Sequence, residues 1–302
     1  MNGQYRRISV IDPLNPTLSR VEDILFSPFD MGKWFVIGFC AWLAYLGSGP
    51  GANLNIGRWE QGGGDVGVFL RENLYWILPV GIMVLLVGVL IGLVVLWLSS
   101  RGRFMFLHCV ATNQGQVKDP WRRYAAHGNS LFFFRLVLGI VGAVVVLLAA
   151  GGVAVAVAAT HALRAMPLVV LALVVGVLVL LPLAVVLGAI GKLTEDFVVP
   201  IMYLETSSCL CAWGRFMEQL KAHFGMIVLY LLFQIVLAMA IGVLLFVVVM
   251  ATCCVACCIL MIPYVGTVLL LPVLVFKRSY SLYFLQQFGP EFDVFSRNAV
   301  GD

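Results

Sequence analysis

The chain has 302 residues and a formal net charge of +4, with 62% hydrophobic and only 11% charged residues. Soluble domains carry about a quarter charged residues, so this chain has too little polar surface to cover a water-soluble globule, and a soluble fold is excluded. The small, dispersed positive charge also excludes a nucleic-acid-binding surface.

The N-terminal segment, residues 1–30, is expected to be a cytoplasmic tail followed by an amphipathic stretch over residues 21–29. Residues 1–20 are polar and contain Pro13 and Pro16. They lack the apolar stretch and small-residue cleavage site of a signal peptide. The first membrane span is therefore expected to act as the targeting signal.

Long uncharged segments dominate the rest of the chain. Residues 74–98, 166–191 and 226–262 carry no charged side chain. Because about 20 apolar helical residues cross the hydrocarbon of a bilayer, these segments predict an all-α, polytopic transmembrane bundle over residues 31–285, followed by a cytoplasmic tail over residues 286–302. The six expected spans cover residues 32–48, 74–98, 131–157, 167–192, 225–250 and 260–283.

The distribution of Lys and Arg predicts the orientation of the chain. In this topology, the two termini and the segments 99–130 and 192–223 share one side and hold most of the basic residues, whereas the other side holds only Arg58, Arg71 and Arg164. An excess of Lys and Arg marks the cytoplasmic face of a membrane protein. We therefore expect the protein in the cell (inner) membrane, with both termini in the cytoplasm.

Two cytoplasmic segments share the pattern Trp, any residue, Arg, aromatic, each just before a new span. This similarity indicates an internal repeat of a surface helix and two spans, with residues 21–29 and the first span as a diverged third copy. Chance similarity between aliphatic helices is the alternative. The residues can be interfacial anchors or a specific lipid or partner site. They are Trp121, Arg123 and Tyr124 in the first segment and Trp213, Arg215 and Phe216 in the second.

Small residues recur in the second and third spans. Gly88 and Gly92 form a Gly-x-x-x-Gly pair, and residues 139–152 contain four further glycines. Such residues let helix backbones approach closely in a membrane, so close helix packing is expected at these positions.

No motif identifies a reaction or a bound cofactor. The zinc-protease, serine-hydrolase and phosphate-loop motifs are absent, and the four histidines, His108, His127, His161 and His223, lie on different segments. The sequence therefore predicts a protein that is not an enzyme and that carries no catalytic residues, cofactor or metal.

The cysteines Cys253, Cys254, Cys257 and Cys258 lie on one side of the expected helix. Four thiolates suit a soft metal, but neighbouring cysteines on one rigid helix do not easily converge on one ion, and no basic residue nearby stabilises thiolates. Packing is the favoured interpretation, with disulfide or redox chemistry and metal binding as alternatives.

Charges near the spans are costly and therefore informative. Glu195 and Asp196 follow the fourth expected span and precede another apolar stretch. We expect an interhelical ion-pair cluster near the inner interface, centred on Asp196, that fixes how the repeats pack. Its expected members besides Asp196 are Glu195, Arg103, Arg135 and Arg278, with Lys277 at a similar depth.

Three segments resemble a known family. They are residues 196–202 (Asp-Phe-Val-Val-Pro-Ile-Met), the Ala-Trp-Gly-Arg-Phe segment at 212–216 leading into residues 223–232, and residues 272–285 with Arg-Ser-Tyr at 278–280. They are similar to uncharacterised six-helix bacterial and archaeal membrane proteins, and broadly to the membrane domain of glycerophosphodiester phosphodiesterases. The resemblance implies architecture alone, because the soluble phosphodiesterase domain and its catalytic residues are absent.

These observations favour a non-enzymatic membrane protein that organises partner proteins or lipids through its basic, aromatic cytoplasmic helices. The expected partners are membrane lipids, other membrane proteins or a second copy of the chain. A transporter or channel for a small solute is the alternative, and a lipid-modifying membrane enzyme is a third hypothesis. A transporter or channel requires a polar cavity that passes through the protein, and a lipid-modifying enzyme requires carboxylates or histidines that converge on one site.

Overall fold

The computed structural model describes residues 8–27, 29–47, 66–163, 166–252, 259–260 and 262–299. Every regular element within these residues is helical, which confirms the expected all-α class. Four helices are long and apolar enough to cross a membrane, so the chain has the make-up of a multi-spanning membrane protein. These candidate spans are Leu78–Thr112, Ala125–Gly152, Val174–Glu205 and Phe224–Ala251.

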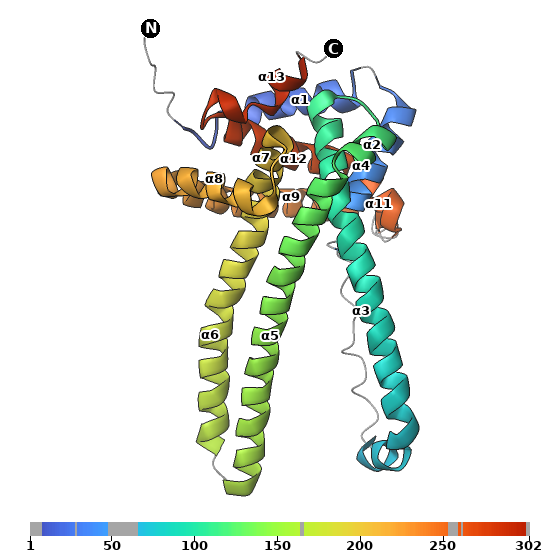
Figure 1. The fold of residues 1–302 in the computed structure, drawn as a ribbon, viewed down its shortest axis with the longest axis vertical. Helices are drawn as coiled ribbons and strands as arrows, with labels where there is room; N and C mark the ends of the chain where they lie inside the picture. Colours follow the sequence, from blue (N-terminus) through green and yellow to red (C-terminus); the bar gives the residue numbers. More distant parts are fainter. Residues whose placement is uncertain are drawn as a thin grey trace.

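Three long helices, α3 (Val66–Thr112), α5 (Ala125–Leu163) and α6 (Met166–Leu193), extend in one direction from the rest of the molecule (Figure 1). We call these helices the legs. The legs expose aliphatic side chains such as Leu86, Leu148 and Leu178, which are 63%, 71% and 72% exposed. Water would make such a surface unstable, whereas lipid tails solvate it.

The remaining helices, with the C-terminal end of α3, form a head at one end of the legs (Figure 1). Both ends of the described chain lie in this head, where α1 packs against α12. The helices of the head are α1 (Leu14–Leu25), α2 (Met31–Ala44), α4 (Lys118–Arg123), α7 (Val199–Glu205), α8 (Cys209–Ala222), α11 (Pro263–Leu269), α12 (Leu271–Gln286), the 3-10 helix η3 (Pro290–Phe292) and α13 (Val294–Ala299).

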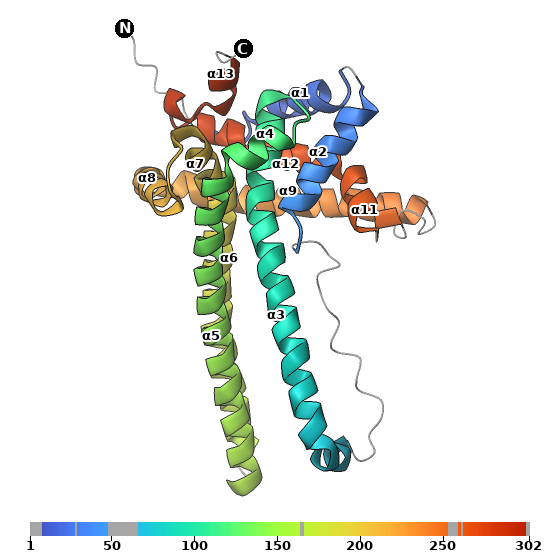
Figure 2. The same ribbon diagram turned by 45° about the vertical axis from the view of Figure 1, so that its right-hand side comes forward.

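The segments expected to be the first and sixth spans form shorter helices within the head (Figure 2). Helix α2 has 14 residues and packs along the end of α3. The expected continuous helix over residues 260–283 is divided into α11, with 7 residues, and α12, with 16 residues. Pro263 and Pro272 lie in the first turns of these two helices, where a missing backbone N–H is tolerated, so the prolines favour two separate helix starts.

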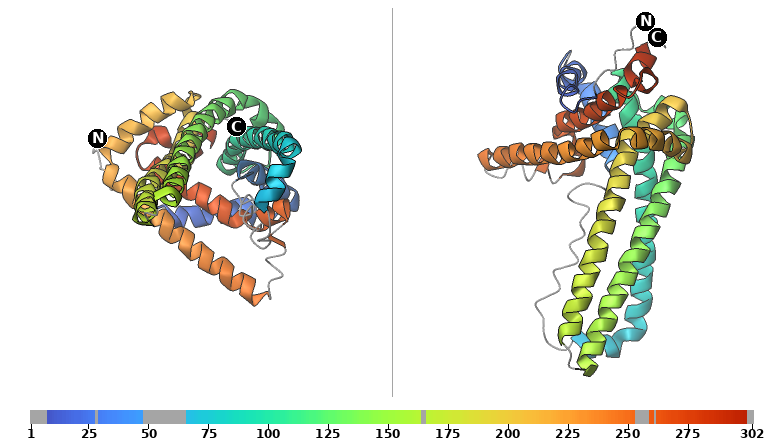
Figure 3. Two further views of the ribbon diagram at one scale, coloured as in Figure 1. Left: turned by 90° about the horizontal axis from the view of Figure 1, so that it is seen from below. Right: turned by 90° about the vertical axis from the view of Figure 1, so that its left-hand side faces the viewer.

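Helix α9 (Phe224–Ala251) runs across the legs instead of along them (Figures 2 and 3). Its buried residues, Ile227, Tyr230 and Gln234, all lie in its first half, where they contact the head. Beyond them, large side chains such as Val243 and Phe246 are each 63% exposed. A helix that is apolar on all sides needs an apolar environment on all sides, so this half of α9 requires lipid or protein around it.

The centre of the head is formed by the end of α3, by the segment between α6 and α8, and by α12. Each contributes a fully buried aromatic residue, namely Phe104, Phe197 and Tyr280. Helix α2 closes the core against α3, where the Cys109 thiol lies 3.7 Å from the Cys40 sulfur. Burying these side chains supplies the main driving force for assembly of the head.

A very close helix approach lies at a glycine outside the expected set, and of the expected glycines only Gly142 has a described neighbour within 4 Å, the Leu187 side chain at 3.5 Å. A Cβ atom added to Gly88 or Gly92 would meet no atom of the described chain within 4 Å. A Cβ atom added to Gly102 would lie only 2.6 Å from the Ala44 nitrogen and from the Leu43 carbonyl carbon. Within the described residues, the expectation of close packing at Gly88 and Gly92 is wrong, and the close approach of helices occurs between α2 and α3.

This contrast predicts opposite effects of the same substitution. Gly102→Ala should lower the free energy of unfolding by about 2 kcal/mol, because backbone atoms of α2 cannot move aside cheaply. Gly92→Ala should leave stability unchanged or raise it, because the methyl group has space and alanine favours a helix. Unfolding of both variants in detergent micelles measures the difference, and equal stability of the two variants would contradict the α2–α3 contact.

Candidate functional site: a charged cluster between the legs and the head

The chain leaves α6 through a five-residue π-turn, η2 (Thr194–Val198), before it enters α7. Glu195 and Asp196 lie in this turn, at the point where the apolar leg ends and the head begins. A π-turn widens the helix and breaks its regular hydrogen-bond pattern, and such turns are frequent at functional sites. The turn brings two adjacent carboxylates to the junction of several helices.

Glu195 is held by two arginines from different helices. The Arg103 Nη1 atom of α3 lies 3.2 Å from the Glu195 Oε2 atom. The Arg278 Nη1 atom of α12 donates a hydrogen bond of 2.6 Å to the Glu195 backbone oxygen. Both arginines are more than nine-tenths buried, so these contacts join α3, η2 and α12 away from solvent.

Asp196 has a different set of partners. The Lys192 ammonium lies 2.9 Å from its Oδ2 atom, and the Tyr230 hydroxyl donates a 2.9 Å hydrogen bond to the same oxygen. The Gln234 side-chain amide in turn donates to the Tyr230 hydroxyl at 2.9 Å. Asp196 therefore attaches the first half of α9 to the end of α6.

The structure brings the expected cluster residues to one region, but the arginines Arg103 and Arg278 contact Glu195 and not Asp196, the expected centre. Arg135 donates to the hydroxyls of Ser99 and Ser100 at 3.3 Å, and neither of its contacts is to a carboxylate. Sequence reasoning missed Lys192, Tyr230 and Gln234 as members. The spacing of four residues between Lys192 and Asp196, and again between Tyr230 and Gln234, was the available signal, since such pairs are neighbours on a helix.

The first basic and aromatic segment forms α4 and the residue that follows it, Tyr124. The second segment lies in α8. The aromatic residues of the two segments mostly face the protein core. Tyr124 is 6% exposed and stacks on Phe104, and Phe216 is 1% exposed and stacks on Phe197. These two rings have almost no surface left for a lipid or a partner in this arrangement.

The tryptophans and arginines of these segments differ in exposure. The Trp213 ring packs on Phe216, and the Trp121 ring packs edge-on against Trp97. Arg123 and Arg215 are exposed, and Arg215 pairs with Glu205 at 3.3 Å. Of the six expected contact residues, the two arginines therefore offer the accessible groups.

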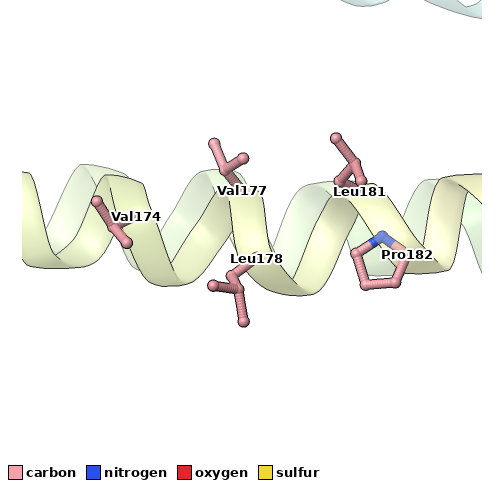
Figure 4. Close-up of a pocket in the computed structure, with 5 residues that line it drawn as sticks. All are labelled: Val174, Val177, Leu178, Leu181 and Pro182. Carbon is pink, nitrogen blue, oxygen red and sulfur yellow. The ribbon is translucent and has the colours of Figure 1, made fainter.

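A shallow pocket lies on the leg α6, around Pro182 (Figure 4). Its lining is entirely aliphatic, and no polar side chain points into it. The pocket can accept a lipid acyl chain and offers no group for chemistry. The expected cysteine group at residues 253, 254, 257 and 258 lies outside the described residues.

Removing the Glu195 carboxylate should destabilise the protein. Glu195→Gln leaves the buried Arg103 without its counter-charge, which typically costs about 3 kcal/mol or more. The matched control is Glu218→Gln, which removes an exposed carboxylate 3.6 Å from Arg215 and should cost less than about 1 kcal/mol. Unfolding in detergent micelles should separate the two variants, and equal losses would show that the cluster does not hold the head together.

The two cysteines of α8 should differ in reactivity. Cys209 is 1% exposed, and burial raises the pKa of its thiol to about 12, so it remains protonated at pH 8. Cys211 is exposed. Only thiolates react readily with maleimides, so labelling at pH 8 should be lost in Cys211→Ser and retained in Cys209→Ser, in a background lacking the other cysteines. Labelling of Cys209 in the folded protein would contradict the orientation of α8.

These features give the class of the protein: an all-helical protein with the make-up of a membrane protein, with exposed apolar legs and a tightly packed head. Residues 8–271 match the family of unknown function DUF7544, and the chain belongs to that family. No curated protein and no solved structure matches the chain. The expected membership of an uncharacterised family is thus confirmed, whereas the broader resemblance to phosphodiesterase membrane domains finds no support.

Proposed function

We propose that the protein is a non-enzymatic component of the cell (inner) membrane that organises lipids or partner proteins through α4 and α8 of its head. The observation that carries this proposal is the way these helices dock. Their aromatic residues pack inward, and their basic residues Arg122, Arg123 and Arg215 remain exposed. Fixed basic groups beside apolar legs suit the anionic headgroups of the cytoplasmic leaflet.

The legs argue for this function over transport. Between the charged cluster and the far end of the legs, the described parts of α3, α5 and α6 carry no charged residue from 78 to 98, from 136 to 152 and from 174 to 191. Polar groups at membrane depth usually mark ion and solute pathways. The described side chains of the legs give no such route, and the polar network of Asp196, Tyr230 and Gln234 ends near the head.

Six crossings with both termini in the cytoplasm complete the proposed topology. The order of elements supports it, because a short helix precedes a pair of longer segments three times: α1 before α2 and α3, α4 before α5 and α6, and α8 before α9 and α11–α12. This order also supports the internal repeat of helix pairs. In the structure α9 runs across the legs (Figures 2 and 3). To cross the bilayer, α9 has to pivot at its N-terminal end until it lies parallel to the legs.

Topology mapping tests the orientation. Reporter tags at the two termini should both be accessible from the cytoplasm, and a cysteine placed between α5 and α6, at position 164, should be labelled only from outside. Leu244→Cys in α9, at a side chain that is 59% exposed here, should resist a membrane-impermeant maleimide because lipid surrounds it. Tags on opposite faces, or rapid labelling of position 244, would contradict the topology.

The organising function is tested with the double substitution Arg122→Gln and Arg123→Gln. Each basic residue near an anionic surface contributes about 1 kcal/mol, so anionic lipids or partners retained with the full chain in native mass spectrometry should decrease at least fivefold. Unchanged retention would contradict the proposal. Solute flux through the purified protein in liposomes would favour transport instead.

A further inference from the structure

The charged cluster contains more positive than negative groups. Arg103, Arg135 and Arg278 lie within electrostatic range of Glu195, and Lys192 and Lys277 lie within range of each other and of both carboxylates. In the described part of the chain, five cationic side chains therefore share two carboxylates. Bringing an uncompensated charge out of water is costly, so a cluster with this excess favours an additional anion.

The buried guanidinium groups also have unused hydrogen-bond donors. Arg278 is 5% exposed, and its Nε and Nη2 atoms have no acceptor among the described residues. The same is true of the Nε atom of Arg103, which is 8% exposed. The cluster thus has more donors than acceptors, which leaves its positive charge incompletely compensated.

One cation at the edge of the cluster is also unpaired. Lys277, which precedes Arg278 on α12, is partly buried and has neither a hydrogen bond nor an ion pair with any described residue. The neighbouring ammonium of Lys192 is 33% exposed. Two ammonium groups that repel each other at a partly open edge are stabilised when an anion lies between them.

The position of the cluster along the legs, at the end of their exposed apolar surface, indicates the source of this anion. On α6, the exposed aliphatic surface continues to Val186, and Lys192 follows less than two turns later. On α3, the exposed surface reaches Val94, and Arg103 follows. Where the apolar surface of a membrane helix ends, lipid phosphates begin.

We propose that the phosphate group of an anionic phospholipid binds at the partly open edge of this cluster, with its oxygens accepting hydrogen bonds from Lys277 and Lys192. This inference rests on the proposed lipid-organising function and gives it a specific site. A phosphate group offers several acceptor oxygens to two ammonium groups at once. The bound lipid lowers the excess positive charge of the cluster by one and fastens the legs to the head.

The test uses the full chain in a neutral detergent, with phosphatidylglycerol added and counted by native mass spectrometry. The wild-type chain should retain one tightly bound phosphatidylglycerol. Lys277→Gln should weaken its binding about fivefold, and Lys277→Arg, which keeps the charge, should retain it. Unfolding curves of the lipid-free variants check that Lys277→Gln still folds. Equal binding by Lys277→Gln and the wild type would overturn the site.

Two further arms separate the sources of phosphate and the two proposals. If inorganic phosphate stabilises the lipid-free protein and phosphatidylglycerol does not, the site takes free phosphate and the lipid assignment is wrong. The Arg122→Gln and Arg123→Gln double variant should lose loosely held lipids and retain the single tight one. Loss of lipid in this variant together with insensitivity at position 277 would overturn this site alone, whereas the reverse pattern would overturn the role of α4.

Discussion

Glu195 provides the contact on which the junction of legs and head depends. Its carboxylate pairs with Arg103 of α3, and its backbone oxygen accepts from Arg278 of α12. One residue therefore joins α3, the turn after α6 and α12. Its neighbour Asp196 adds α9 through Tyr230. In the hydrocarbon, apolar packing between helices has little advantage over packing against lipid, so polar contacts at the junction add to the core packing of the head in holding the legs to it.

The same junction explains why the head can be so densely packed beside such open legs. The exposed aliphatic surface of the legs suits lipid tails, and α5 packs against both α6 and α3. The head encloses stacked rings, including Phe197 on Phe216 at 5.1 Å and Tyr230 on Tyr280 at 5.8 Å. Helix α9 belongs to both environments, because its first half is fixed to the head and its second half presents only apolar side chains.

The features that the sequence predicts well are those determined by composition over a long window. Uncharged segments such as residues 74–98 are long enough to cross a membrane as helices, and the structure shows a long apolar helix there. The gathering of Glu195, Arg103 and Arg278 follows from the cost of leaving charges beside apolar helices without partners. The individual pairings do not follow, because they depend on the π-turn at residues 194–198, which no local pattern announces.

Tertiary packing accounts for what the sequence reasoning missed. An aromatic residue on an amphipathic helix has the same pattern whether it faces lipid or protein, so Phe216 and Tyr124 looked interfacial and are buried. Likewise, the composition of α2 does not show which helix it packs against, and the structure places it against the end of α3, where Gly102 allows close approach. Such choices are made by the shape of a neighbouring helix and not by the segment itself.

The head also joins the beginning of the chain to its end. The Ser9 nitrogen donates to the Gln287 side-chain oxygen at 2.7 Å, the Gln287 amide donates back to the Ser9 carbonyl at 3.0 Å, and the Tyr280 hydroxyl donates to the Val10 carbonyl at 2.8 Å. Ribosomes add about 5–20 residues per second, so α1 is made tens of seconds before its partner α12 exists. During translation α1 therefore remains without its partner until α12 has left the ribosome, and this part of the head closes only then.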